Sequence, residues 1–302
     1  MTAKQMQLLS IGEAMAELRS AGPDFAVGFA GDTFNTAVYC RRLLPPGMQV
    51  GYLTHVGTDP LSDGFLALAR AEGIGTSAIT RDPLHNIGIY SVQTDAAGER
   101  SFHYWRSASA ARLLFRGGAD LAVLDGAERI FLSAITLAIL APEARAALLD
   151  RLATLRATGT AIAFDSNYRP RLWPDAETAR DWTRRMWLMT DVALASVDDE
   201  QALFGDADAS AVLDRLRTDG CREGALKCGA RGPIPIAPDI RPGPFAPAAQ
   251  VVDTTAAGDS FNGAYLAARI LGHDEGAAMD WGHRMAATVI GQPGAIIPRT
   301  IR

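Results

Sequence analysis

Hydrophobic and polar positions along the chain alternate in a way that predicts strands and helices in turn. Short apolar runs are typical of buried strands; they lie at residues 7–12, 48–56, 129–133, 160–165, 192–196 and 224–227. Between them, three longer segments show helical spacing or helix-boundary signals, at residues 31–44, 61–72 and 142–158. This order of elements predicts a mainly parallel sheet with helices on its faces.

Two segments interrupt the alternation. Residues 13–27 and 86–106 have strand-like patterns, and 95–99 has the composition of a turn. We expect them to form a small β lid at the edge of the main sheet. Residues 233–247 carry six prolines, which predicts an extended connection. Because no repeat or flexible linker divides the chain, we expect a single domain over residues 1–302 with the lid inserted.

Composition limits the classes of partner. The chain has 302 residues, of which 48% are hydrophobic and 21% charged, a balance typical of soluble globular proteins. A net charge of -5 argues against nucleic acid or an anionic membrane as the main partner. The apolar run at 130–141 is too short to span a bilayer and is interpreted as a strand followed by a loop.

The cysteines indicate the compartment. Cys40, Cys221 and Cys228 form neither a C-x-x-C pair nor a cluster at metal-ligand spacing. We therefore expect reduced thiols in a cytoplasmic protein that acts on small molecules.

An anion site is predicted where a strand end meets a helix expected at residues 260–271. Ala256, Ala257 and Gly258 are too small to shield the backbone, so their N–H groups can point at one anion. Asp259 should be ionised near neutrality at this positive helix end and could accept a hydroxyl proton, although a plain N-cap is the alternative. A phosphate beside a carboxylate indicates phosphoryl transfer.

A second helix start carries polar groups suited to sugar hydroxyls. Gly31, Asp32 and Asn35 fall close together there, with simple helix capping as the alternative.

Two arginines point to an anionic substrate. Arg106 shares a strand face with Tyr104 in the predicted lid, and Arg169 follows the carboxyl end of a predicted strand, where ligands of open α/β sheets bind. A sugar acid offers a guanidinium a carboxylate to pair with, whereas a neutral sugar does not. Arg106 could equally be a surface residue on an edge strand.

Two motifs resemble signatures of one family. Residues 253–259, Asp-Thr-Thr-Ala-Ala-Gly-Asp, resemble the Asp-Thr-x-Gly-Ala-Gly-Asp signature of the ribokinase-like (PfkB) sugar kinases. Residues 30–35 resemble that family's Gly-Gly-x-x-x-Asn sugar-binding signature, with Ala30 in place of one glycine. Ala256 replaces the first glycine of the other signature, and alanine rarely adopts a positive φ. The same alanine form occurs in the 2-keto-3-deoxygluconate kinases of the family, which segments 104–106, 167–173 and 294–299 also resemble.

The resemblance runs from about residue 8 to 299 and implies a ribokinase-like three-layer α/β/α fold with a β lid. It implies an ATP- and Mg²⁺-dependent kinase that phosphorylates the 6-hydroxyl of 2-keto-3-deoxy-D-gluconate, with Asp259 as the base. A monovalent-cation requirement and the subunit number are left open, although exposed lid edges favour a homo-oligomer.

The resemblance also implies roles for single residues. Those around the sugar acid are Tyr90, Tyr104, Arg106 and Arg169; those near the nucleotide are Lys227, Gly229, Gly232, Ala287 and Gly294. Glu200 is implied to act on magnesium indirectly, through water. Without the resemblance, Tyr90 could be lid core, Lys227 a solvated charge, and Glu200 part of an acidic first helical turn favoured by the dipole.

Other functions remain as alternatives. A kinase for fructose, ribose or 2-keto-3-deoxygalactonate would share these motifs, and a catalytically silent sugar-acid sensor on the same fold would lack turnover. A nicotinamide-binding protein is disfavoured because no G-x-G-x-x-G follows the first strand.

Overall fold

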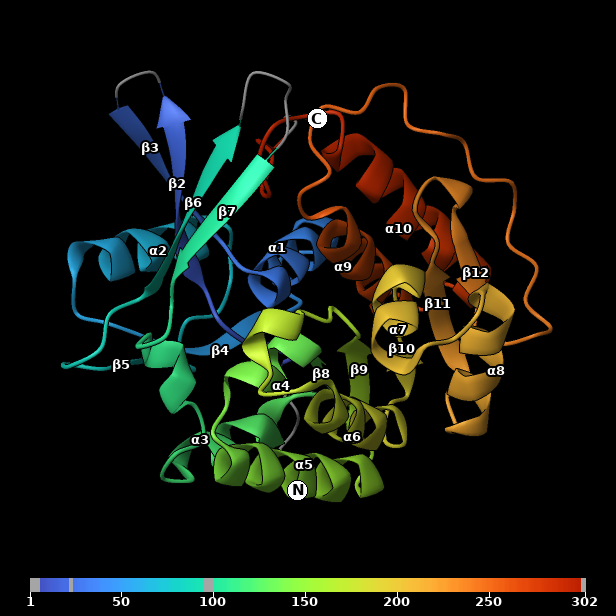
Figure 1. Cartoon of the computed structure of the whole chain (residues 1–302), viewed down its shortest axis with the longest axis horizontal. Coiled ribbons are helices and arrows are strands. Elements are labelled where there is room, and N and C mark those ends of the chain that lie inside the picture. Colours follow the sequence, from blue (N-terminus) through green and yellow to red (C-terminus); the bar gives the residue numbers. More distant parts are fainter. Residues whose placement is uncertain (1–5, 22–23, 95–99, 300–302) are drawn as a thin grey trace.

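The main sheet forms the centre of the molecule in the computed structural model, which describes residues 6–21, 24–94 and 100–299 (Figure 1). Its strand order is β12-β11-β10-β9-β8-β1-β4-β5, with every neighbouring pair parallel except β11 and β12. The strands are β1 Leu8–Ile11, β4 Val50–Val56, β5 Ile79–Arg81, β8 Arg129–Ser133, β9 Ala161–Asp165, β10 Val192–Ala193, β11 Glu223–Lys227 and β12 Pro233–Pro235.

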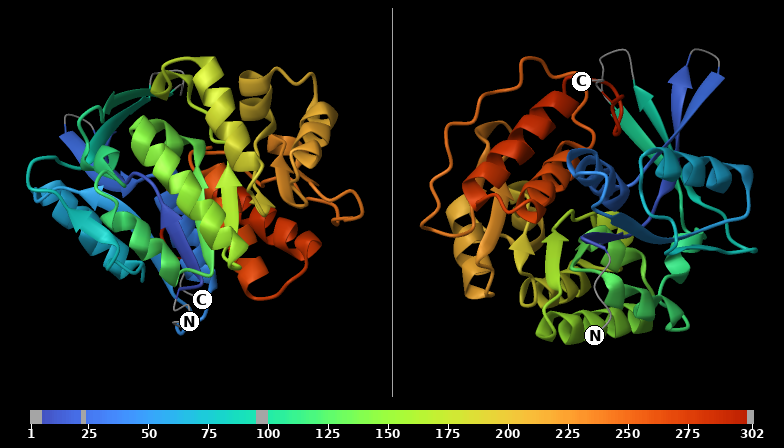
Figure 2. Two further views of the ribbon diagram at one scale, coloured as in Figure 1. Left: turned by 90° about the horizontal axis from the view of Figure 1, so that it is seen from below. Right: turned by 180° about the vertical axis from the view of Figure 1, so that it is seen from behind.

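Helices cover both faces of this sheet, because successive side chains in its buried strands point to opposite layers (Figure 2). In β8, Phe131 packs in one apolar cluster, while Ile130 and Leu132 pack in the other. The first cluster is completed by α1 Asp32–Leu43, α2 Pro60–Ala71, α9 Ala257–Ile270 and α10 Glu275–Val289. The second is completed by α3 Ala119–Val123, α4 Ala134–Ile139, α5 Pro142–Ala157, α6 Ala176–Trp187, α7 Val197–Phe204 and α8 Ala209–Thr218. The predicted three-layer arrangement is confirmed.

A second sheet, the lid, stands beside the first (Figure 1). Its order is β3-β2-β6-β7, two antiparallel hairpins joined by a parallel β2–β6 pair. Its strands are β2 Met15–Ala21, β3 Asp24–Ala30, β6 Gly88–Thr94 and β7 Arg100–Trp105. Phe29 of the lid packs edge to face on Phe65 of α2, with ring centroids 6.3 Å apart. The predicted lid is confirmed, with β3 continuing to Ala30; the predicted turn at 95–99 lies outside the described residues.

The loop predicted near residue 134 is wrong. β8 ends at Ser133, whose side chain caps α4 in a reciprocal capping box with Thr136. Because a continuous apolar run does not distinguish a buried strand from a buried helix, hydropathy alone could not locate the boundary between β8 and α4. Neither this segment nor any other helix in the described ranges is long and apolar enough to cross a membrane.

Candidate active site

The turn before α9 is fixed by one carboxylate. Asp253 accepts hydrogen bonds from the backbone N–H of Thr255 at 2.9 Å and from that of Gly294 at 2.6 Å. This joins the start of α9 to the loop that follows α10. Gly294 itself has a φ of 90°, a conformation that favours glycine.

Ala256 occupies the N-cap of α9 in a left-handed conformation, with φ 60° and ψ 17°. Among the non-glycine residues that the structure describes, only Phe115 also has a positive φ. The left-handed conformation costs an ordinary residue about 1–2 kcal/mol, and such strain concentrates at functional sites. The alanine therefore keeps the backbone shape that a glycine would adopt without strain.

The first turn of α9 presents unshielded donors. No side chain of the described residues caps it, and the N–H groups of Gly258 and Asp259 have no acceptor within the helix. The N–H of Ala257 makes only a long bond, 3.3 Å, to the Thr254 carbonyl. The Lys227 ammonium lies 3.4 Å from where a Cβ on Gly258 would be. Backbone donors, the helix dipole and an ammonium thus converge on one place suited to a phosphate.

Asp259 links this anion site to the predicted sugar site. Its Oδ2 accepts a 2.8 Å hydrogen bond from Asn35 Nδ2, and its backbone carbonyl accepts one from Thr36 Oγ1 at 3.1 Å. The helices can approach because Gly263 faces α1: a Cβ there would lie 2.6 Å from the Thr36 carbonyl oxygen. The two signature motifs, more than two hundred residues apart, therefore meet at Asp259.

The pKa of Asp259 is raised to about 7, first by burial and then by the negative charges of Asp32 and Asp165. The hydrogen bond from Asn35 and the charge of Lys227 act in the opposite direction. The expectation that Asp259 is ionised near neutrality therefore needs correction. A helix N-terminus favours the ionised form, but burial and the two neighbouring carboxylates favour the protonated one.

Polar side chains from the ends of β8 and β9 surround Asp32. Its Oδ2 accepts hydrogen bonds from Ser133 Oγ and, at 2.7 Å, from Asn167 Nδ2. Asp165 accepts from Lys227 Nζ at 2.8 Å and from Asn262 Nδ2 at 2.6 Å. Of these residues, Lys227 is a predicted nucleotide residue, whereas Ser133, Asp165 and Asn262 are not among the predicted site residues. The available signal was the position of Ser133 and Asp165 as the last residues of parallel strands.

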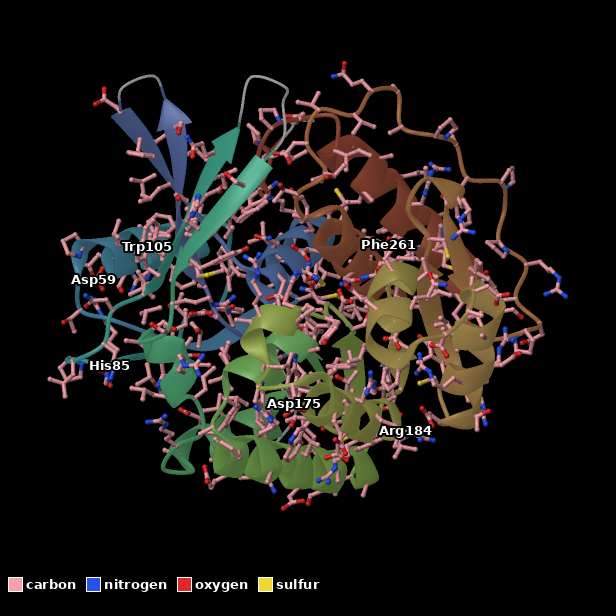
Figure 3. All side chains as sticks on the ribbon, in the orientation of Figure 1. Asp59, His85, Trp105, Asp175, Arg184 and Phe261 are labelled. Carbon is pink, nitrogen blue, oxygen red and sulfur yellow. The ribbon has the colours of Figure 1, made fainter. Side chains whose placement is uncertain are left out.

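The lid carries aromatic rings next to Arg106. Tyr90 stacks on Tyr104 with centroids 5.9 Å apart, and the Arg106 guanidinium lies 5.9 Å from the Tyr104 centroid. Tyr90 is buried, and this burial, followed by the charge of Glu17, raises the pKa of its hydroxyl. In Figure 3, Trp105 of β7 and Phe261 of α9 mark the lid side and the α9 side of this region.

Lid and α9 meet in a small apolar cluster. Met15 and Tyr90 of the lid pack with Ala295 of the loop after α10, and Ala256 joins this contact. Tyr90 thus belongs to the lid core, and its role beside the sugar acid stays a prediction.

The two arginines each have a carboxylate partner. Arg106 is buried and pairs with Glu13, which follows β1. The Arg169 side chain is 52% exposed and its Nη1 lies 3.3 Å from Asp199 Oδ1. Burial raises the pKa of Asp199 to about 6, against the lowering effect of Arg169.

Glu200 has a different arginine as its partner. Its side chain is fully buried and its Oε2 accepts from Arg215 of α8 at 2.7 Å. Burial raises the pKa of Glu200 to about 7 despite that arginine. Oε1 has no hydrogen-bond partner within the described part of the chain. The charge of Asp165 raises the pKa of the neighbouring Asp199, and that of Lys227 lowers it.

The remaining predicted nucleotide residues lie on two elements. Gly229 and Gly232 flank a short turn after β11 with φ of 57° and 81°, and Ala287 lies on α10. A Cβ on Gly232 would meet the ring of Phe245 at 2.8 Å. The nucleotide role of Gly229, Gly232 and Ala287 stays a prediction.

Related sequences cover nearly the whole chain. The 2-dehydro-3-deoxygluconokinase of Escherichia coli K12 is 41% identical over 298 residues, 96% of both chains. The enzyme of that name from Dickeya dadantii is 41% identical and covers 99% of this chain and 98% of its own. That of Haemophilus influenzae is 38% identical, with 96% and 95% covered.

Solved structures share the fold at lower identity. A 2-dehydro-3-deoxygluconokinase from Thermotoga maritima has a TM-score of 0.81 at 22% identity, covering 97% of this chain and 96% of its own. A putative ribokinase II from E. coli in complex with ATP and Mg²⁺ has a TM-score of 0.83 at 22% identity, covering 96% and 94%. The model of the pfkB family carbohydrate kinases matches residues 6–302, so the chain belongs to that family.

Proposed function

We propose that this protein is an ATP-dependent kinase that transfers a phosphoryl group to the 6-hydroxyl of 2-keto-3-deoxy-D-gluconate, giving the 6-phosphate and ADP. The observation that carries the proposal is Asp259, a carboxylate held by Asn35 at an uncapped helix N-terminus. The relatives named 2-dehydro-3-deoxygluconokinase support this substrate, which is the same compound under another name.

In the proposed reaction, the oxygen of the 6-hydroxyl bonds to the γ-phosphorus of ATP, and Asp259 accepts the proton of that hydroxyl. The bond from that phosphorus to the bridging oxygen breaks, and ADP leaves with the electron pair. The N–H groups of Ala256, Ala257 and Gly258 stabilise the charge on the transferred group, because they are fixed before it arrives. Closure of the lid excludes water and so limits ATP hydrolysis.

The substrate carboxylate would be held by Arg106 and Arg169. Both guanidiniums already face a protein carboxylate, Glu13 and Asp199 respectively. For the buried Arg106, this pairing offsets the cost of burying its charge before the ligand binds. Stacked Tyr90 and Tyr104 would form the wall beside the sugar acid.

Magnesium would be held mainly by phosphates and water. Among the described residues no group of three acidic, histidine or cysteine side chains could hold a metal ion, which fits an ion that keeps several waters. Glu200 Oε1, which accepts no hydrogen bond from the described residues, could accept one from a water, in keeping with an indirect role. When bound, magnesium would supply positive charge that neutralises the phosphates.

We also propose that two copies pair through their lids. Phe25, Val27 and Phe29 alternate on one face of β3; Phe29 is covered by α2, while Phe25 and Val27 are 59% and 51% exposed. A second copy would cover them and the exposed edge. Sedimentation should give a dimer or larger assembly for the native chain and a monomer for Val27→Lys; a monomeric native chain would contradict the proposal.

A substrate panel with purified protein tests the reaction. ADP release should be fastest with 2-keto-3-deoxy-D-gluconate, slower with 2-keto-3-deoxygalactonate, and weak with fructose or ribose. Faster turnover of a neutral sugar would replace the proposed substrate by that sugar. Sugar-dependent ADP release of any kind would exclude the silent sensor.

The carboxylate clamp is tested separately. Arg169→Ala should raise KM for the sugar acid about tenfold, the loss of one charge-assisted contact. Arg171→Ala is the matched control, an exposed arginine in the same turn. Equal KM values for the two variants would remove Arg169 from the clamp.

A further inference from the structure

Glu13 is a buried carboxylate that the reaction described above does not use. It lies two residues after β1 with 1% of its surface exposed. An ionised carboxylate at such a depth must be paired and hydrogen-bonded to be tolerated. Arg106 Nη2 donates to Oε2, and Ser109 Oγ donates to Oε1. Both partners come from the segment that leaves the lid after β7.

The backbone around Glu13 is packed without spare room. A Cβ on Gly31 would lie 2.2 Å from the Glu13 carbonyl oxygen, and one on Gly88 would lie 2.7 Å from Glu13 Oε1. Gly31 precedes α1 in the predicted sugar-binding motif, and Gly88 begins β6. Both glycines therefore permit the close approach that fixes the Glu13 carboxylate where the lid joins the main sheet.

Arg106 is balanced in charge but incompletely hydrogen-bonded. A guanidinium has five N–H donors, and here only Nη2 donates to a described residue. Nε is buried and has no partner within the described residues. A buried arginine with unused donors is unusual, since buried polar groups are nearly always satisfied. Its unused donors make it suited to a planar anion that arrives later.

We propose that Glu13, supported by Ser109, is a positioning residue that holds the Arg106 guanidinium for the carboxylate of a sugar acid. This inference rests on the proposed function. Glu13 acts through Arg106. It binds the Nη2 group of the guanidinium, so that the remaining N–H donors of Arg106 keep a single orientation. Preference for an acid over a neutral sugar then depends on Glu13 as well as on Arg106.

The test is the kinetics of Glu13→Gln, which keeps the shape and removes the charge. We expect KM for the sugar acid to rise about tenfold, while KM for ATP and kcat stay within about threefold. The ratio of kcat/KM for the sugar acid to that for fructose should fall by the same factor. A purely structural role would instead change all constants together, or none.

Asp219→Asn is the matched control. Asp219 is also buried, and it also accepts from an arginine, Arg184 of α6, which lies far from the lid in Figure 3. The Asp219→Asn substitution should lower thermal stability without changing KM for the sugar acid. A comparable KM increase in this control would overturn the inference.

A double-mutant cycle shows whether Glu13 acts through Arg106. Glu13→Gln should add no further KM increase to Arg106→Gln; additive effects would contradict the inference.

If Glu13→Gln does not fold, Ser109→Ala provides a second test, because it removes only the supporting bond. It should raise KM for the sugar acid about two- to threefold, and an unchanged KM would contradict the inference. A native chain inactive toward every sugar acid would overturn the proposed function and this inference together, whereas an active native chain with an unchanged Glu13→Gln overturns only the latter.

Discussion

The lid side of the site is built from charged and aromatic side chains, whereas the α9 side is built from the peptide backbone. On the lid side, Arg106 is held between Glu13 and the ring of Tyr104. On the α9 side, Ala256 and Gly258 contribute little beyond N–H groups and their small size. In the proposed reaction, the sugar acid would be recognised by side chains that can be exchanged one at a time, while the phosphate would be recognised by a backbone shape that single side chains hardly alter.

Asp259 combines a backbone position with a side-chain contact. Its main chain lies in the first turn of α9, and its carboxylate accepts from Asn35 of α1. The comparison therefore predicts that changes to side chains alter turnover or KM at nearly constant stability. Changes to the backbone side should alter stability first.

The largest effect is expected for Asp259→Asn. The amide keeps the volume and the contact with Asn35 but cannot accept the hydroxyl proton. Loss of a general base reduces kcat by about 10²- to 10⁴-fold. A coupled assay measures this, with ATP affinity and melting temperature as controls for an intact fold. Turnover near that of the native chain would remove Asp259 from its role as base.

The pH dependence should show the same carboxylate. Because Asp259 must be deprotonated and its pKa is about 7, kcat/KM for the sugar should fall about tenfold per pH unit below that value. Asp32→Asn removes one cause of the raised pKa and should shift this acid limb to lower pH. An unshifted limb would mean that another group titrates.

Stability should follow the opposite course. The folded pKa of Asp259 lies above its ordinary value of 3.8, so the folded chain binds this proton more tightly than the unfolded chain. The resulting stability is fully present below about pH 3.8 and is lost as the pH rises through 7. Denaturant titrations of the native chain and Asp259→Asn, compared at both ends of this range, isolate this contribution.

On the backbone side, Gly263→Ala should destabilise the fold. Its Cβ would lie 2.6 Å from the Thr36 carbonyl oxygen and 2.8 Å from Tyr39 Cβ, and such overpacking costs about 1–3 kcal/mol. Gly276→Ala in α10 is the control, because its nearest neighbour would be an ordinary 3.4 Å away. Equal free energies of unfolding for the two variants would show that α1 and α9 are not closely packed.

The smallest effect is expected for Ala256→Gly. Glycine adopts the left-handed conformation without strain but loses more entropy on folding, so the net gain in stability should be below about 1 kcal/mol. kcat should stay within about twofold because the N–H groups are unchanged. A large loss of stability would mean that Ala256 contributes through its apolar contact with the lid.

The sequence predicted most of the secondary structure and the local motifs, but few of the contacts between residues far apart in the chain. Strands, flanking helices and the lid follow from hydropathy, and the motifs placed Asp259 and Asn35. The role of Glu13 could not be predicted, because a single glutamate after a strand forms no recognisable sequence motif. Its importance comes from Arg106, 93 residues later.

The acidic turn of α7 illustrates a second limit. Neighbouring residues on a helix point about 100° apart, so Asp199 and Glu200 face different surroundings. The packing of α7, with Val197 and Leu203 buried, also buries Glu200. The sequence alone gives the acids but not the rotation of the helix.

The carboxylate of Asp253 has a consequence for the order of events in solution. It binds the turn before α9 and the loop after α10, and Ala295 of that loop contacts Met15 and Tyr90 of the lid. Ligands at the two ends of the site would therefore act on connected parts of the molecule: the turn before α9, the loop after α10 and the lid. If ATP tightens the binding of the sugar acid by some factor, the sugar acid must tighten the binding of ATP by the same factor. Such reciprocity would keep ATP weakly bound until an acceptor is present.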